Sequence, residues 1–222
     1  MYVFFDVDGT LLSCKSMVRF QDFYLRRDGP WPRGLGPLRS GLGFAPLGFW
    51  QVLRRDRFFM NRAYYRTFRG RAPDVVRARA SEWFEHEKRR RPDLWIASAV
   101  RALEEHRARG HQPVLVSGSM VEILEPIARE LGVAHALATR LVVHDGRYTG
   151  EIDGPQMLGP GKADALRGFL VAHGGNAAEC FAYGDHISDV PMLEAVGHAV
   201  VVGEDPELTG YARQRRWTRL AA

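Results

Sequence analysis

The sequence predicts an α/β fold: a doubly wound, mainly parallel sheet with a helical cap inserted after the first strand. From Leu94 onward, short apolar runs typical of buried strands alternate with segments of helical spacing. This alternation favours parallel βαβ units. Between about residues 14 and 91 the alternation is interrupted, and apolar and aromatic residues recur at helical spacing instead. We therefore expect a core of residues 1–13 and 92–222 and a cap of residues 14–91.

Within the cap, helices are expected at residues 16–27, about 49–68 and 73–89. The last of these begins with Pro73, which suits the first turn of a helix. Residues 29–48 are rich in glycine and proline, which is typical of a loop or lid. The aromatic residues in and beside this stretch are expected to pack the cap against the core, or to line a pocket or lid. They are Trp31, Phe44, Phe49 and Trp50.

The core is expected to begin with a buried strand at residues 2–5, an apolar run that ends in a glycine turn. Further strands are predicted at residues 113–117, 135–139, 180–183 and 199–202. Helices are predicted at residues 94–109, 120–131, 162–173 and 191–195. Residues 141–143 and 148–152 flank Asp145 and Gly146, and Asp-Gly between two apolar runs indicates a β-hairpin.

The composition is that of a globular protein, and we expect it to be cytoplasmic. The chain has 222 residues, of which 45% are hydrophobic and 26% charged. No run reaches the roughly 18 apolar residues of a membrane span, and the first residues lack the basic region of a signal peptide. Cys14 and Cys180 are far apart and have no CxxC spacing. We therefore expect free thiols in a reducing compartment, with neither a disulfide framework nor a zinc site.

The net charge of +5 is a mild basic excess, with clusters at residues 54–57 and 88–91. Such clusters are usually solvated helix faces. A basic face could also attract an anionic small substrate or bind nucleic acid. A nucleic-acid-binding module is thus an alternative reading, although it leaves the polar motifs described next unexplained.

Asp6 and Asp8 lie directly after the first predicted strand, where open α/β sheets place their chemistry. Two close carboxylates repel each other unless a cation or a proton lies between them. The pair therefore suits a divalent metal, a carboxylate nucleophile and a partner that moves protons. The simpler alternative is an acidic turn that caps a helix.

Three further polar groups lie where a predicted strand ends or a helix begins. Ser117 and Gly118 follow the strand at residues 113–117, Lys162 opens a helix, and Asp185 and Asp189 follow the strand at residues 180–183. Taken singly, each also fits a helix cap or a surface group. Together they supply the carboxylates, the ammonium and the hydroxyl and amide donors that phosphoryl transfer requires.

The order of these motifs resembles that of the haloacid dehalogenase-like phosphohydrolases, and most closely their phosphoserine phosphatase-like branch, subfamily IB. The sequence from Asp6 to Thr10 is similar to the family's first motif, DxDGT, and residues 116–119 to the second. Lys162 resembles the third motif and the sequence from Gly184 to Asp189 the fourth, GDxxxD. The resemblance spans nearly the whole chain and implies a Rossmann-like sheet with a C1-type cap.

The resemblance implies a role for each matching residue. Asp6 is expected to attack phosphorus and become an aspartyl-phosphate, while Asp8 protonates the leaving oxygen and then activates water. Mg²⁺ is the implied cofactor, held by the carboxylates of Asp6 and Asp185 and the backbone carbonyl of Asp8. Asp189 is expected to bind the metal through water or to orient Lys162. The phosphoryl oxygens are expected to be held by Ser117, Gly118 and Lys162.

The substrate is expected to be a small phosphate ester, with neither nucleic acid nor membrane as partner and a monomer or homodimer as the assembly. Phosphoserine phosphatases carry a glutamate after the first motif that pairs with the serine ammonium, whereas this chain has Lys15 in that region. We therefore expect a substrate other than phosphoserine. The candidate residues for the leaving group are Lys15, Arg19, Arg62, Arg66 and His186. A phosphotransferase of the same fold, which passes the phosphoryl group to an alcohol, is the alternative function.

Overall fold

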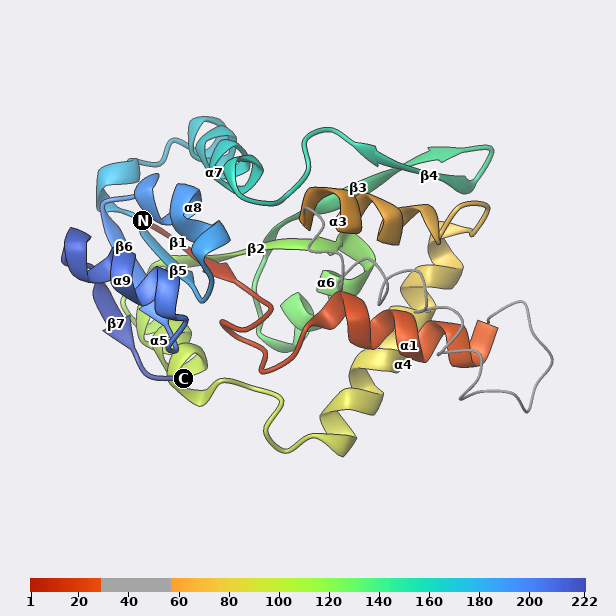
Figure 1. Cartoon of the computed structure of the whole chain (residues 1–222), viewed down its shortest axis with the longest axis horizontal. Coiled ribbons are helices and arrows are strands. Elements are labelled where there is room, and N and C mark those ends of the chain that lie inside the picture. Colours follow the sequence, from red (N-terminus) through yellow and green to blue (C-terminus); the bar gives the residue numbers. More distant parts are fainter. Residues whose placement is uncertain (29–56) are drawn as a thin grey trace.

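The computed structural model describes residues 1–28 and 57–222, and within these ranges it is an α/β protein, as the sequence predicts. A seven-stranded sheet runs in the order β4-β3-β2-β1-β5-β6-β7 (Figure 1). Every neighbouring pair is parallel except β3 and β4, which are antiparallel. The strands are β1 (Tyr2–Asp6), β2 (Gln112–Met120), β3 (His135–His144), β4 (Arg147–Asp153), β5 (Phe181–Gly184), β6 (His198–Val202) and β7 (Thr218–Leu220).

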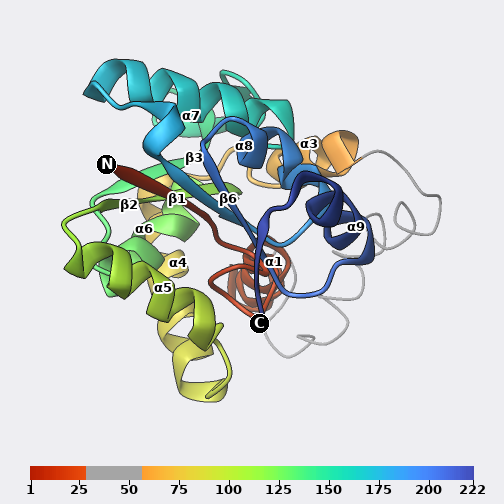
Figure 2. The ribbon, with the colours of Figure 1, turned by 90° about the vertical axis from the view of Figure 1, so that its left-hand side faces the viewer.

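Helices cover both faces of the sheet, with α7 and α5 on opposite sides of the strands (Figure 2). The α-helices are α1 (Ser16–Asp28), α3 (Arg57–Arg66), α4 (Pro73–Arg90), α5 (Ala97–Ala108), α6 (Val121–Glu130), α7 (Pro160–His173), α8 (Val190–Glu194) and α9 (Pro206–Arg215). Two short 3-10 helices, Ala177–Glu179 and Ile187–Asp189, flank β5.

The buried residues of β1 divide between the two faces because successive strand side chains point in opposite directions. Phe4 packs with residues of α7, α8 and α9 in one apolar cluster. Val3 and Phe5 belong to the other cluster, which includes residues of α5 and α6. A strand that is buried on both faces explains why its sequence is a continuous apolar run rather than an alternating one.

The second cluster also extends into the helices expected to form the cap. Phe20 of α1, Tyr65 of α3 and Trp83 of α4 lie in the same buried cluster as Phe5. The division into a core (1–13 and 92–222) and a cap (14–91) remains our proposal. Because the apolar packing is continuous across that boundary, the described cap helices are expected to unfold together with the core rather than independently.

Two predicted boundaries differ from the structure for tertiary reasons. The helix expected at residues 94–109 begins only at Ala97, since the preceding residues pair with the loop after β1: the Ser13 N–H donates to the Leu94 carbonyl at 2.9 Å and the Ile96 N–H to the Leu11 carbonyl at 2.9 Å. The runs at residues 135–139 and 141–143 form one strand, β3, whose first part pairs with β2 and whose second part pairs with β4.

The predicted hairpin is present, with Asp145 and Gly146 at φ 50° and 69° between β3 and β4. Both values lie in the left-handed region that a two-residue type I′ turn requires. The β4 strand is bonded to the turn after α3: the Tyr148 N–H donates to the Arg71 carbonyl at 2.9 Å, and the Gly70 N–H donates to the Tyr148 carbonyl at 2.8 Å. The hairpin thus ties the helix pair α3 and α4 to the sheet.

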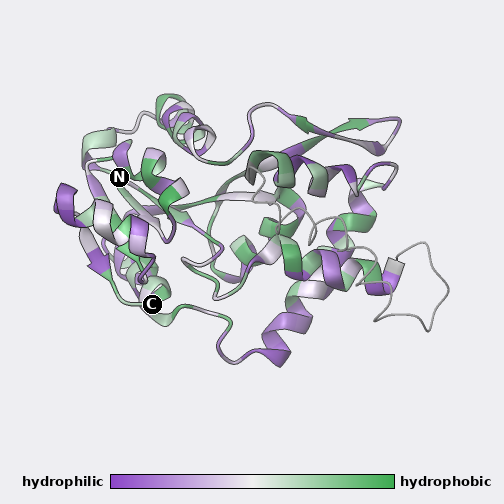
Figure 3. Cartoon of the chain, in the orientation of Figure 1, coloured by the Kyte–Doolittle hydropathy of each residue, from purple (hydrophilic) through white to green (hydrophobic). Residues whose placement is uncertain are grey.

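Some predictions fall outside the described residues: the glycine-rich stretch 29–48, Trp31, Phe44, Phe49, Trp50 and residues 54–56. The basic cluster at residues 88–91 lies at the end of α4, which is hydrophilic in Figure 3. Lys88 there is paired with Glu130 at 2.7 Å and Glu85 at 3.4 Å. Within the described ranges, no helix combines the length and apolar character needed to cross a membrane.

Candidate active site

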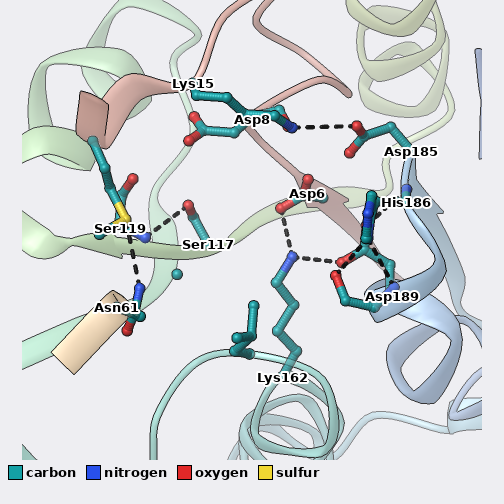
Figure 4. Close-up of a pocket in the computed structure, with 14 residues that line it drawn as sticks. Asp6, Asp8, Lys15, Asn61, Ser117, Ser119, Lys162, Asp185, His186 and Asp189 are labelled. Carbon is teal, nitrogen blue, oxygen red and sulfur yellow. Dashed lines mark hydrogen bonds and ion pairs between the residues drawn. The ribbon is translucent and has the colours of Figure 1, made fainter. Parts of the chain in front are cut away.

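A cavity of about 110 Å³ lies at the carboxyl ends of β1, β2 and β5 (Figure 4). It brings together nine of the residues that the sequence analysis singled out, which come from both the expected core and the expected cap. They are Asp6, Asp8, Lys15, Ser117, Gly118, Lys162, Asp185, His186 and Asp189.

The sheet register explains why residues so distant in sequence meet here. Asp6, the last residue of β1, lies beside Val116 of β2, so Ser117 follows at the same edge. Phe5 lies beside Tyr183 of β5, and Gly184 and Asp185 follow there. Because the parallel strands end together, the polar residues that come directly after each apolar run converge at one edge.

Lys162 forms the centre of a buried ion-pair network. Its Nζ lies 2.6 Å from Oδ1 of Asp6 and 2.7 Å from Oδ1 of Asp189. Burial disfavours the ammonium form, but the two carboxylates of Asp189 and Asp6 outweigh burial and raise the pKa of Lys162. The lysine therefore carries a fixed positive charge beside Asp6, where it can neutralise an anion that approaches this carboxylate.

Asp189 is held from two sides. One carboxylate oxygen contacts Lys162, and the other accepts a 3.3 Å hydrogen bond from the backbone N–H of His186. The Asp189 N–H in turn donates to the His186 carbonyl at 2.8 Å. Both oxygens of Asp189 are thus engaged by the protein, which suits a residue that orients Lys162.

Asp8 has one fixed and one unsatisfied carboxylate oxygen. Oδ2 accepts a 2.9 Å hydrogen bond from the backbone N–H of Ser16, at the start of α1. Oδ1 is screened from solvent and has no hydrogen-bond partner among the described residues. Burial raises the pKa of Asp8 to about 6. A carboxyl group with such a pKa can both donate and accept a proton near neutral pH.

The turn after β2 is held by hydrogen bonds from three elements. Ser117 Oγ accepts from the Ser119 N–H at 3.0 Å, and Ser119 Oγ lies 2.6 Å from Ser16 Oγ. The Gly118 carbonyl accepts from Thr139 Oγ1 at 3.0 Å and from the Tyr65 hydroxyl. These contacts fix Ser117 and Gly118 at the cavity wall, where the Ser117 hydroxyl and the Gly118 N–H can donate hydrogen bonds to an anion.

Asp185 is oriented by Thr10, whose Oγ1 lies 3.3 Å from its Oδ1. Gly9 leaves room for it, because a Cβ at Gly9 would lie 2.1 Å from Oδ2 of Asp185. The positive φ of Gly9, 103°, also favours glycine. The turn at Gly9, in the first motif, therefore leaves space for the carboxylate of Asp185, in the fourth motif.

The donor set fits a hard divalent cation. Carboxylate oxygens of Asp6, Asp185 and Asp189 lie within 4.8 Å of one another, and the Asp8 carbonyl faces the same cavity, where a cationic group, the Lys15 ammonium, already contacts it at 2.6 Å. Oxygen ligands of this kind, with room for waters and a substrate phosphate, suit Mg²⁺. Asp6, Asp185 and the Asp8 carbonyl would hold such an ion, while Asp189, whose two oxygens contact Lys162 and the His186 N–H, would orient Lys162 beside it.

Of the residues proposed for the leaving group, Lys15 and His186 line the cavity, and the Nδ1 of His186 lies 3.1 Å from the Ser188 hydroxyl. The three arginines do not line it. Arg19 pairs with Glu87 at 3.0 Å, and Arg66 lies 3.5 Å from Glu151. Arg62 is exposed.

Asn61 is a cavity residue that the sequence analysis missed. Its Oδ1 accepts from Gln156 Nε2 at 2.8 Å, and its Nδ2 lies 3.6 Å from the sulfur of Met17, which also lines the cavity. The helical spacing of the sequence could have indicated this residue. Asn61 precedes the buried residues Tyr64, Tyr65 and Phe68 by three, four and seven positions, which places all four on one face of the helix. The arginines on the other face turn to solvent.

The family model for "haloacid dehalogenase-like hydrolase" matches residues 3–194, which include every motif of the cavity. The chain belongs to this family. The residues that the sheet register brings to one edge lie within this match, and the resemblance seen in the sequence is confirmed.

Similar proteins include phosphatases. "Phosphoserine phosphatase SerB1" of Mycobacterium tuberculosis is 33% identical over 221 residues, which cover 96% of this chain and 68% of that protein. "Probable phosphatase" of the same organism is 46% identical over 128 residues, 58% of this chain and 44% of its own length. The match thus spans less than half of that relative.

A solved structure, a protein of unknown function from Bordetella pertussis Tohama I, has a TM-score of 0.81 at 27% identity and covers 98% of this chain and 96% of its own. This agreement over nearly the full length of both chains supports the sheet order and helix positions described above.

Proposed function

We propose that this chain is a Mg²⁺-dependent phosphatase that hydrolyses a phosphomonoester of a small metabolite through an aspartyl-phosphate on Asp6. The observation that carries the proposal is the arrangement of three groups in one cavity. Asp6 is a carboxylate at the carboxyl end of β1, Lys162 lies 2.6 Å from it, and Asp8 presents an oxygen that has no hydrogen-bond partner among the described residues. They correspond to a nucleophile, a fixed cation and a proton carrier.

In the first step, an oxygen of Asp6 attacks phosphorus, and the bond from phosphorus to the leaving oxygen breaks. Asp8 in its protonated form gives its proton to that oxygen, so the product leaves as a neutral hydroxyl. The Lys162 ammonium and the Ser117 hydroxyl balance the charge on the phosphoryl oxygens. Without that cation, the dianion of a phosphate ester would be repelled by Asp6.

In the second step, Asp8, now a carboxylate, takes a proton from water as the water oxygen attacks phosphorus. The bond between phosphorus and Asp6 breaks, inorganic phosphate leaves, and both aspartates return to their starting forms. Mg²⁺, when bound by Asp6, Asp185 and the Asp8 carbonyl, would supply further neutralisation of the phosphoryl charge. Asp189 keeps Lys162 in place throughout.

The leaving group is proposed to carry negative charge or hydroxyl groups. Lys15 and Asn61 border the cavity on the side of α1 and α3. An ammonium and an amide there would favour such a group and disfavour the ammonium of phosphoserine. The proposed substrate therefore differs from the phosphoserine in the name of the relative SerB1, which is 33% identical to this chain.

The experiment is to measure hydrolysis of p-nitrophenyl phosphate by the wild type and Asp6→Asn, with acid-quench labelling by a ³²P-labelled ester. The wild type is expected to hydrolyse the ester and to become transiently labelled. Asp6→Asn is expected to do neither while keeping its fold, and Asp74→Asn, whose carboxylate is exposed on α4, is expected to match the wild type. Full activity of Asp6→Asn would refute the nucleophile, and label transferred to an added alcohol would indicate the phosphotransferase instead.

A further inference from the structure

Lys15 reaches into the cavity from the turn before α1. Its Nζ donates to the backbone carbonyl of Asp8 at 2.6 Å and lies 3.5 Å from Oδ2 of Asp185 (Figure 4). The side chain is 55% exposed. The ammonium therefore contacts two oxygens of the acidic site while most of the lysine remains in contact with solvent.

These two oxygens are the ones that the proposed function assigns to Mg²⁺, together with Asp6. An ammonium that occupies them leaves no room for a metal ion at the same point. Asp6 also contacts a lysine, since its Oδ1 lies 2.6 Å from Nζ of Lys162. In the structure described here, each candidate metal ligand is therefore in contact with a lysine.

We propose that Lys15 is an internal competitor for the metal: its ammonium must leave the Asp8 carbonyl and Asp185 before Mg²⁺ binds, and it thereby lowers the affinity for Mg²⁺. This inference rests on the proposed metal site. The exposure of the side chain allows the displacement, since the ammonium can turn to the cavity mouth and regain water. After it has moved, it remains near the leaving-group side of the cavity.

The ligands do not depend on Lys15 for their positions. The Asp8 carbonyl shares a peptide unit with the Gly9 N–H, which donates to the Leu12 carbonyl at 2.7 Å, and Asp185 contacts Thr10 at 3.3 Å. Replacing Lys15 by methionine keeps an unbranched side chain of similar length and removes the charge together with the N–H donors. Lys15→Met is therefore expected to leave the metal ligands in place and to free them from the competing cation.

The test is a titration of the purified protein with Mg²⁺ alone, by isothermal calorimetry at one ionic strength, with the Mg²⁺-dependent rise in melting temperature as a second readout. Lys15→Met is expected to bind Mg²⁺ about five- to tenfold more tightly than the wild type, since it removes both the contact and the like-charge repulsion. Lys15→Arg keeps the charge and is expected to stay close to the wild type. Lys88→Met removes a lysine from α4, outside the cavity lining, and is the matched control.

Equal or weaker Mg²⁺ binding by Lys15→Met would overturn the inference. Asp185→Asn separates this failure from that of the metal site. If Asp185→Asn loses the Mg²⁺ heat while Lys15→Met equals the wild type, the metal site stands and the competition is refuted. If neither the wild type nor Lys15→Met binds Mg²⁺, both the competition and the metal part of the proposed function fall.

Discussion

The ammonium of Lys162 lies 2.6 Å from Oδ1 of Asp6, although 156 positions separate the two residues in the chain. Both side chains are almost fully buried, at 5% and 7% exposure. The pair joins the start of α7 to the end of β1 and, through Asp189, to the segment after β5. One buried cation thus ties together three elements at the point where the chemistry is proposed.

This network predicts that Lys162→Met destabilises the protein as well as inactivating it. The substitution leaves Asp6 and Asp189 buried without their counter-ion, and breaking a buried pair in this way costs about 3–5 kcal/mol. Urea unfolding measures the effect. Arg167→Met, which removes an exposed ion pair on the same helix, is expected to change the free energy of unfolding by less than about 1 kcal/mol.

The double variant Lys162→Met/Asp189→Asn is the internal check on that explanation. It removes one of the two stranded charges, so it is expected to be more stable than Lys162→Met alone. If Lys162→Met proves no less stable than Arg167→Met, the buried charges are compensated in some other way and the prediction is wrong.

A second prediction concerns Asp8. Asparagine has a similar shape but can neither deliver nor take up the proton, so Asp8→Asn is expected to lower kcat by about 10²–10⁴-fold. The loss should be greater for an alkyl phosphate than for p-nitrophenyl phosphate, whose leaving group needs little protonation. Steady-state kinetics on both esters measure the difference, with Asp22→Asn, on the exposed side of α1, as control. Equal losses of kcat/KM on the two esters would argue against Asp8 as the acid of the first step, because kcat/KM does not depend on the second step.

A third prediction concerns the charge of the leaving group near Lys15. Phosphoglycolate and phosphoethanolamine are two-carbon esters with leaving groups of opposite charge. The wild type is expected to have the higher kcat/KM for phosphoglycolate, because the ammonium of Lys15 attracts the carboxylate and repels the amine. Lys15→Met should reduce this preference several-fold, and Lys15→Glu should reduce it further. A preference that is unchanged in both variants would remove Lys15 from substrate selection.

A fourth prediction concerns acid stability. The imidazole of His106 on α5 is 4% exposed and lies 2.9 Å from the Tyr183 hydroxyl and 2.8 Å from Nδ1 of His111. Burial, with a further contribution from His111, lowers the pKa of His106 to about 4 from 6.5. Between these two values the unfolded chain binds the proton and the folded chain does not, so the free energy of unfolding falls as the pH falls.

The contribution of His106 to the free energy of unfolding should be complete above about pH 6.5 and lost by about pH 4, with a total on the order of 3 kcal/mol. Urea unfolding at pH 7 and pH 5 is expected to give a smaller pH dependence for His106→Phe than for the wild type. His144→Asn, an exposed histidine at the end of β3, should keep the wild-type dependence. The same slope in His106→Phe would mean that other groups cause the acid sensitivity.

Much of the site could be predicted because its residues follow apolar runs directly. Asp6 ends β1, Ser117 follows Val116 of β2, and Asp185 follows Gly184 of β5. Parallel pairing brings such positions to one edge whatever the details of packing. The orientation of the cap helices, in contrast, depends on which face each buries, and for this reason the sequence favours the arginines of α3 as site residues over Asn61.

The sequence by itself determined the α/β class, the family and the residues at the sheet edge, because these follow from the local order of apolar runs and polar motifs. Only the tertiary structure decided that Lys162 joins Asp6 to Asp189, that Lys15 contacts Asp8 and Asp185, and that the polar segment Thr218–Leu220 adds a seventh strand. These features are contacts between residues far apart in the chain. Their geometry is set by how helices and strands pack, which no local pattern of residues specifies.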